Sequence, residues 1–156
     1  RHESQQDRSY RNNCEVQQMK ALLGNLDLVL SAQNCDEKIK VLLLAPYSAQ
    51  VNAIRQSLQS IVLPSGNLSL EVNTVDAAQG READVLLFST TRSNSAGQIG
   101  FLKELSRANV ALSRARYLLA IVGDASFLSL VESPFKRVLS HIRANPGSCS
   151  VSVGER

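Results

Sequence analysis

Short segments rich in valine, leucine and isoleucine recur along the chain and predict its strands. They lie at residues 40–44, 68–72, 85–90 and 117–122. A continuous apolar run of this length is typical of a strand that is buried on both faces, as in a parallel sheet. Between these segments, apolar residues recur every three or four positions, which predicts helices.

Helices are expected at residues 13–30 and 48–60, and two closing helices at 125–131 and 135–144 are separated by Pro134. Strands that alternate with helices through short turns indicate an α/β domain. In such a domain, helices cover both faces of a parallel sheet. The polar start of the chain carries no such pattern, so we expect residues 1–12 to be frayed.

The length of 156 residues is enough for one domain with a hydrophobic core. We expect a disordered tail at residues 1–8, the domain at 9–145 and a flexible tail at 146–156. The chain begins with Arg1 and not with methionine, so we expect it to be a piece of a longer protein.

Composition narrows the class of protein only slightly. The net charge of +3 is compatible with nucleic-acid binding but does not by itself indicate it. Aromatic residues make up only 4% of the chain, so base stacking is not expected to dominate any such binding. The three cysteines are widely spaced without a CxxC pair, which favours free thiols in a reducing compartment. With no apolar run of transmembrane length, we expect an intracellular protein, cytoplasmic or nuclear, without a membrane partner.

The richest chemistry lies in the segment 74–116. A turn with Asp76, Gly80 and Glu82 precedes an apolar strand. The last part of the segment carries three arginines, at positions 107, 114 and 116. If residues 105–116 form one helix, Leu105, Ala108, Leu112 and Ala115 make its apolar stripe. On that helix Arg107 and Arg114 share a face, Arg114 is free to reach an anion, and Arg116 packs or caps the last carbonyls. A solvated basic face is the alternative.

Two stretches of this segment resemble motifs V and VI of superfamily 1 helicases. They are TVDAAQGREADV at 74–85 and NVALSRAR at 109–116. The closest resemblance is to the family of the nonsense-mediated-decay helicase and senataxin. Further motifs agree in order and spacing: TRSN at 91–94, IGFL at 99–102 and IVGD at 121–124. Ala45 and Ala78 depart from the family pattern, which has threonine and an aromatic residue at these positions.

The resemblance implies the second RecA-like domain of an ATP-dependent RNA or DNA helicase. Its cofactors would be ATP and Mg²⁺, and its partners single-stranded RNA or DNA and the first RecA-like domain of the same chain. The expected catalytic residue is Arg114, the arginine finger. Expected ATP-binding residues are Gln79, Gly80, Glu82, Arg107 and Arg116. Expected nucleic-acid-binding residues are Tyr47, Gln50, Thr74, Arg92 and Asn94. No metal ligand is expected.

An ATP-driven motor also needs a phosphate-binding P-loop, GxxxxGK[ST], and an acid for Mg²⁺. No two glycines of this chain are five positions apart, and no predicted strand ends in an Asp-Glu pair. The resemblance implies that the parent protein is an NTP hydrolase, and because the P-loop and the acid are missing we expect this piece alone to be inactive.

Several alternatives remain open. The chain could be a non-catalytic, helicase-like interaction module or an unrelated nucleotide-binding α/β domain. Tyr47 and Gln50 could cap and pack a helix instead of touching nucleic acid. Arg92 and Asn94 could tie their loop to the sheet. Glu82 could form a salt bridge with Arg81 or Arg92.

Overall fold

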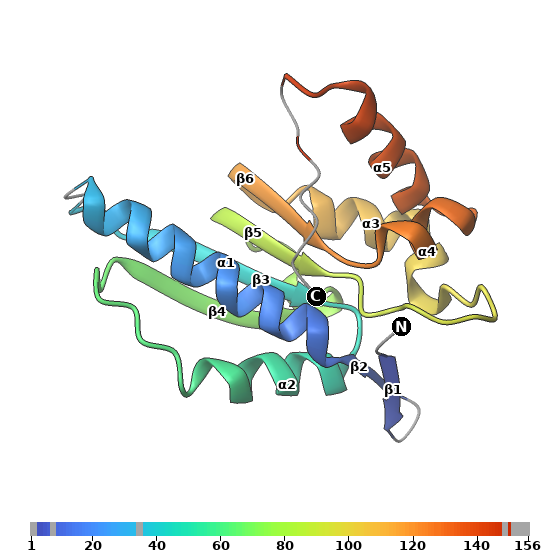
Figure 1. The fold of residues 1–156 in the computed structure, drawn as a ribbon, viewed down its shortest axis with the longest axis horizontal. Coiled ribbons are helices and arrows are strands. Elements are labelled where there is room, and N and C mark those ends of the chain that lie inside the picture. The colour runs from blue at the N-terminus through green and yellow to red at the C-terminus, as the bar shows by residue number, and fades with distance from the viewer. Residues whose placement is uncertain (1–2, 7–8, 34–35, 148–149, 151–156) are drawn as a thin grey trace.

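The computed structural model describes residues 3–6, 9–33, 36–147 and 150 (Figure 1). Strands and helices follow one another through most of the chain. The strands are β1 (Glu3–Gln6), β2 (Ser9–Asn12), β3 (Ile39–Ala45), β4 (Leu68–Thr74), β5 (Ala83–Ser89) and β6 (Ala115–Val122). The α-helices are α1 (Asn13–Ala32), α2 (Ser48–Leu58), α3 (Leu105–Leu112), α4 (Ala125–Leu130) and α5 (Pro134–Ala144). Two 3₁₀ turns, η1 (Asp76–Ala78) and η2 (Gly100–Lys103), complete the set.

The main sheet is parallel throughout, in the order β4-β3-β5-β6. Central strand β3 pairs Leu43 with Val72 of β4 on one side and with Leu87 of β5 on the other. The predicted α/β class is therefore confirmed, and the arrangement is RecA-like. Strand β6 lies at one edge, where the side chain of Tyr117 is 85% exposed and Leu118 is half-exposed.

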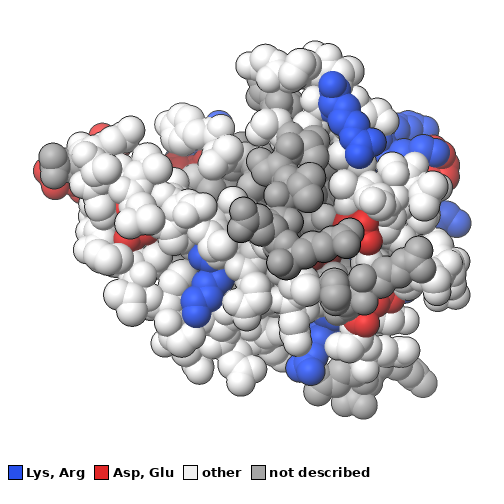
Figure 2. Space-filling model, viewed as in Figure 1, with Lys and Arg blue, Asp and Glu red and all other residues white. Residues whose placement is uncertain are grey.

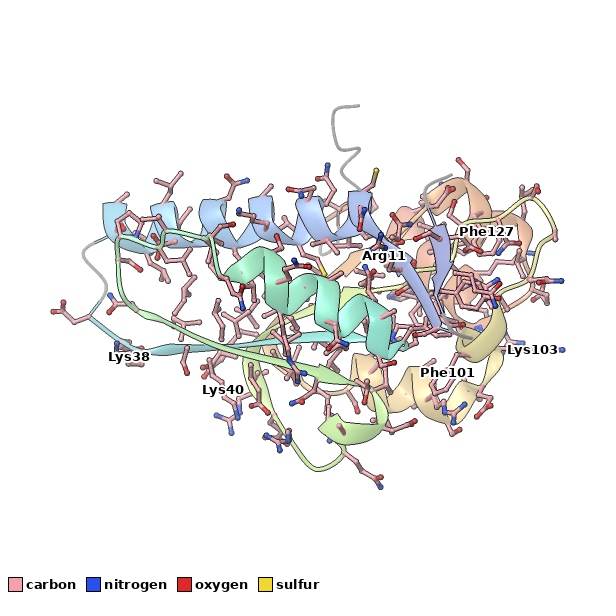
Figure 3. All side chains as sticks on the ribbon, turned by 90° about the horizontal axis from the view of Figure 1, so that it is seen from below. Arg11, Lys38, Lys40, Phe101, Lys103 and Phe127 are labelled. Atoms are coloured by element: carbon pink, nitrogen blue, oxygen red, sulfur yellow. The ribbon has the colours of Figure 1, made fainter. Side chains whose placement is uncertain are left out.

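Alternate residues of the buried strands build two cores on opposite faces of the sheet. On one face Val41, Leu43 and Leu87 pack against α1 and α2. On the other face Leu42, Leu44, Leu86 and Phe88 pack against α3, α4 and α5, and the Phe88 ring stacks on Phe135 with ring centroids 5.3 Å apart. Figure 3 shows α1 on one side of the sheet and α3 on the other. Near-continuous apolar strands follow from this double burial.

The start of the chain differs from the expectation of a frayed tail. Residues 3–6 and 9–12 form an antiparallel hairpin in which Glu3 pairs with Asn12. No apolar pattern predicts this hairpin, because long-range polar contacts attach it to the domain. For example, Ser9 Oγ accepts a hydrogen bond from the amide of Ala49 at 3.1 Å. Residues 1–2 and 7–8 and most of the expected tail at 146–156 lie outside the described residues, and the domain limits of 9 and 145 stay a prediction.

The helix predicted for 105–116 is shorter than its apolar spacing suggests. Helix α3 ends at Leu112, and Ala115 and Arg116 already belong to β6. Pairing of Ala115 with Ala83 of β5 prevails over helical spacing. The predicted stripe is wrong in part, since Leu105 is more than half exposed. Arg107 and Arg114 consequently do not share a helical face.

Candidate nucleotide and nucleic-acid sites

The parallel strands divide the candidate residues between two ends of the sheet. Strands β3, β4, β5 and β6 all end on one side, the carboxyl edge, and begin on the other, the amino edge. Helix α3 leads from the end of β5 to the start of β6, so it returns from the carboxyl to the amino edge. Figure 3 shows Lys38 and Lys40 toward one end of the sheet and Phe101 and Lys103 toward the other.

Arg114, the predicted catalytic residue, lies in the turn between α3 and β6. Its carbonyl accepts from the amide of Ala83 at 3.0 Å, which fixes the turn against the start of β5. Its guanidinium folds back, where Nε donates to the carbonyl of Val110 at 2.9 Å and Nη2 donates to Ser113 Oγ at 2.9 Å. The expectation that Arg114 reaches outward and Arg116 caps the helix is thus wrong for this structure. Because α3 ends at Leu112, Arg114 is the arginine closest to the free carbonyls.

Two shallow hollows flank the exposed side of α3. One, of about 400 Å³, is lined by residues that include Val110, Ser113 and Arg114. The other, of about 250 Å³, lies between η1 and α3 and is lined by residues that include Gln79, Arg107 and Val110. Val110 lines both, so the hollows adjoin. The structure therefore brings predicted ATP-binding residues of two motifs to one flank of the domain.

Arg107 and Arg116 each lie against carboxylates. Arg107 contacts Asp76 at 3.4 Å and Glu104 at 2.8 Å. Arg116 contacts Glu82 at 3.3 Å, so the salt bridge considered as an alternative role for Glu82 forms with Arg116 and not with Arg81 or Arg92. Arg81 pairs instead with Glu71. Arg116 and Glu82 are each more than half exposed and Arg107 is about one third exposed, and such pairs contribute little to stability.

Gly80 turns the chain between η1 and β5 with φ of +78°, a left-handed conformation that favours glycine. A β-carbon at this position would meet nothing within 4 Å, so the backbone here is open to an incoming ligand. Guanidinium, amide and carboxylate groups fit the phosphates and the ribose hydroxyls of a nucleotide. Among the described residues, no group of three or more His, Cys, Asp or Glu side chains could hold a metal ion.

The residues predicted to bind nucleic acid lie at the carboxyl edge. Thr74 ends β4, and its Oγ1 accepts from the amide of Ala77 at 3.3 Å. Gln50 is 0% exposed, and its amide bonds to Asn12 and Ser89. Such burial leaves Gln50 no surface for nucleic acid in this structure and favours its packing alternative. Its hydrogen bonds tie β2, α2 and β5 together.

Arg92 and Asn94 surround one carboxylate oxygen, Oε2 of Glu3. Arg92 Nε donates to it at 3.2 Å, the amide of Ser93 at 2.6 Å and Asn94 Nδ2 at 3.4 Å. Asn94 also donates to the carbonyl of Gln98 at 2.8 Å. These three donors, here called the 92–94 nest, face an anion that the chain itself supplies.

Three aromatic rings line the same edge. Tyr47 contacts Tyr10 with ring centroids 5.2 Å apart and Phe101 with centroids 6.0 Å apart. The guanidinium of Arg92 lies 3.8 Å from the Tyr10 ring, and that of Arg107 lies 3.5 Å from the Phe101 ring. Sequence reasoning missed Glu3 and Tyr10, which carry no local signal. The IGFL motif at 99–102 could have pointed to Phe101.

A buried polar cluster holds the loop that carries the nest. Glu15, 4% exposed, accepts from Ser89 Oγ at 2.6 Å and from the amide of Thr91 at 2.8 Å. Asn12 donates to Glu15 at 3.1 Å and to the carbonyl of Thr91 at 3.3 Å. Thr91 adopts φ of +67°, which is rare for a β-branched residue. Both of its backbone groups are thus held by the start of α1.

Burial and hydrogen bonding act in opposite directions on the pKa values at this edge. Burial raises the pKa of Glu15 from 4.5 to about 7, although the bonds from Ser89, Thr91 and Thr90 lower it. For Asp124, the N-cap of α4, burial raises the pKa but the bonds from Ser93 and Phe127 prevail and lower it. For Arg92, burial lowers the pKa and contact with the Tyr47 hydroxyl and Glu3 raises it above the usual value.

Within the part of the chain that the structure describes, no helix combines the length and apolar character that crossing a membrane requires. Among the same residues, Cys14 is a free and exposed thiol. Cys35 and Cys149, also predicted to be free, lie outside the described residues.

Known proteins match most of this chain. A family model described as an AAA domain (AAA_12) matches residues 1–126. "Probable helicase MAGATAMA 3" of Arabidopsis thaliana is 36% identical over 102 residues, which cover 61% of this chain and 12% of that protein. "DNA-binding protein SMUBP-2" of Mus musculus is 41% identical over 85 residues, 54% of this chain and 8% of that protein. "Helicase sen1" of Schizosaccharomyces pombe is 36% identical over 103 residues, 62% of this chain and 6% of that protein.

The chain therefore spans only a small part of the length of these relatives. Their names agree with the resemblance of its motifs to the senataxin-like helicases, which is confirmed. The chain belongs to the AAA domain family and is a helicase domain of the superfamily 1 kind.

Proposed function

We propose that the chain is the second motor domain of an ATP-dependent helicase that acts on single-stranded RNA or DNA. It supplies the arginine finger Arg114, the ribose contact Glu82 and part of the groove for nucleic acid. The first RecA-like domain of the same parent chain supplies the P-loop and holds Mg²⁺. The intact protein couples ATP hydrolysis to movement along one strand.

The observation that carries this proposal is the adjoining pair of hollows beside α3. They place Arg114, Arg107 and Gln79 along one open flank. An open flank suits a nucleotide that is held between two domains, because a second domain must close over it. A guanidinium there can stabilise the charge that develops on the γ-phosphate during transfer. Where Arg114 now bonds to Val110, a phosphate would compete for the same donors.

The carboxyl edge supports the nucleic-acid part of the proposal. It gathers Arg92, Asn94 and the ring of Tyr47 on loops at the strand ends, where α/β domains bind ligands. Such contacts position the phosphate backbone of a strand without reading its sequence. On the face shown in Figure 2, the lysine and arginine side chains of the described residues are scattered among uncharged and acidic residues and form no continuous basic field.

We expect the purified 156-residue chain to fold and to hydrolyse no ATP above background, with or without nucleic acid. Its sequence contains no P-loop to hold the phosphates, and we propose that Mg²⁺ is held by the other domain. Release of phosphate in the presence of Mg²⁺, together with circular dichroism to verify the fold, measures this. Magnesium-dependent turnover by the folded chain would refute the division of the site between two domains.

Binding of single-stranded nucleic acid to the same chain is expected to be weak, insensitive to sequence and strongly dependent on salt. The expected contacts are few and go to phosphates, whose counterions are released on binding. Fluorescence anisotropy of labelled oligonucleotides of different sequence, measured at several salt concentrations, tests this. Tight binding that persists at high salt would instead indicate a surface that reads bases.

A further inference from the structure

The 92–94 nest has the composition of a phosphate site. A guanidinium, a backbone amide and a side-chain amide converge on one oxygen of Glu3, at 3.2, 2.6 and 3.4 Å. Charge-assisted bonds of this kind hold carboxylate and phosphate oxygens equally well. The side chains of Glu3 and Arg92 are only 12% and 4% exposed, so water does not compete for these donors.

The geometry points to Glu3 as an internal occupant of a phosphate site. Strand β1 closes the nest while no nucleic acid is bound, and a backbone phosphate of a single strand displaces the Glu3 carboxylate. This inference rests on the nucleic-acid role proposed above. The Glu3 carboxylate would compete with the phosphate for the donors of the nest. The affinity of the chain for nucleic acid would therefore be lower than without this competition.

Strand β1 is attached in a way that permits this exchange. Among the described strands it pairs only with β2, and a lone two-stranded hairpin is marginally stable. Strand β2 is anchored independently, since Ser9 bonds to Ala49 and Asn12 to Gln50. Among the described residues, the hydrogen bonds that join β1 to the body of the domain all end at the Glu3 carboxylate. Loss of that one contact therefore frees β1 and leaves β2 in place.

The nest itself is held by other residues and would remain after Glu3 leaves. Glu15 and Asn12 bond to both backbone groups of Thr91, the residue before Arg92. A substituent at Gly100 would also collide with the Tyr47 hydroxyl, at 2.5 Å, and approach Arg92 Nη1 at 3.1 Å. The bonds to Thr91 and the close packing at Gly100 keep the donors of the nest aligned for an incoming phosphate.

The test is the affinity of the 156-residue chain for a labelled single-stranded oligonucleotide, with Glu3→Gln as the main variant. Glu3→Gln keeps the side-chain shape and removes the charge that competes with phosphate. Glu132→Gln is the matched control, because it removes the same charge from a fully exposed side chain that pairs with Lys136. We expect Glu3→Gln to raise affinity about tenfold and Glu132→Gln to raise it much less. The double variant Glu3→Gln, Arg92→Gln should lose the gain.

Equal gains in Glu3→Gln and Glu132→Gln would overturn the inference and leave the nucleic-acid role intact. Absence of binding by every chain at low salt would overturn both. The amide resonance of Ser93 in the unmodified chain provides a second measurement that needs no variant. It should shift on titration with the oligonucleotide and much less with inorganic phosphate at equal phosphate concentration. An unchanged resonance at saturation, or an equal response to inorganic phosphate, would exclude a backbone phosphate as the occupant.

Discussion

Replacing Arg114 with alanine in the parent helicase proposed above is expected to lower kcat for ATP hydrolysis about 10³-fold or more. In its proposed role the guanidinium acts on charge that develops in the transition state, so KM for ATP should change much less. In the isolated domain the same change removes the bonds to Val110 and Ser113. These are partly exposed, and their loss should lower the free energy of unfolding by only about 1 kcal/mol. Steady-state ATPase kinetics and urea unfolding measure the two effects separately.

Matched variants at the neighbouring arginines make this prediction specific. Arg114→Lys should not restore kcat, because an ammonium group lacks the planar fork of guanidinium. Arg107→Ala removes pairs with Asp76 and Glu104 and should cost less activity than Arg114→Ala. Normal turnover by Arg114→Ala beside an inactive Arg107→Ala would mean that Arg107 is the finger. If both variants unfold, this flank of the domain is structural.

A change at Glu15 should alter how stability depends on pH. Its pKa is about 7 in the folded chain and 4.5 ordinarily, so between these values the folded form holds a proton that the unfolded form has lost. The free energy of unfolding should therefore fall by about 3 kcal/mol as pH rises from 4.5 to 7. Glu15→Gln mimics the protonated form and should remove this slope. Urea unfolding at pH 5 and pH 8 measures it.

Two further variants separate the charge of Glu15 from its bonds. Glu15→Ala leaves donors of Asn12, Ser89 and Thr91 without their partner and should destabilise the fold at every pH. Asp124→Asn should lower stability at neutral pH and lose this effect in acid, because the pKa of Asp124 is lowered and the stabilisation by its charged form disappears as pH falls below the ordinary 3.8. A Glu15→Gln chain with the same slope as the unmodified chain would show that another group titrates in this window.

The strands were predictable from sequence because each is buried on two faces and therefore apolar along most of its length. The end of α3 was not predictable, since Leu112 and Ala115 keep helical spacing while the strand partner of Ala115 is Ala83, far away in sequence. The hairpin at the start was missed for a related reason. Its docking depends on Glu3 and on a loop about ninety residues further along the chain, which no local pattern contains.

The candidate site was predictable as a set of residues but not as an arrangement. Motif spacing placed Gln79 and Arg107 in one site, and the hollow between η1 and α3 contains both. The same motifs gave no sign that Arg114 bonds to its own helix or that Gln50 is fully buried. These outcomes depend on where a helix stops and on which polar groups the sheet encloses. The functional roles of all these residues stay predictions.

The edge strand β6 has a consequence for handling the isolated chain. Its segment 117–122 is uncharged, free of proline and glycine, and paired only with β5 among the described strands. A strand edge of this composition that stays unpaired can offer its backbone groups to an identical strand of another molecule, which is the first step of fibrillar aggregation. Natural edge strands resist this with charged residues, yet Arg116 at the start of β6 already pairs with Glu82. Tyr117 is 85% exposed. Replacing it with lysine would therefore protect the edge with little loss of packing.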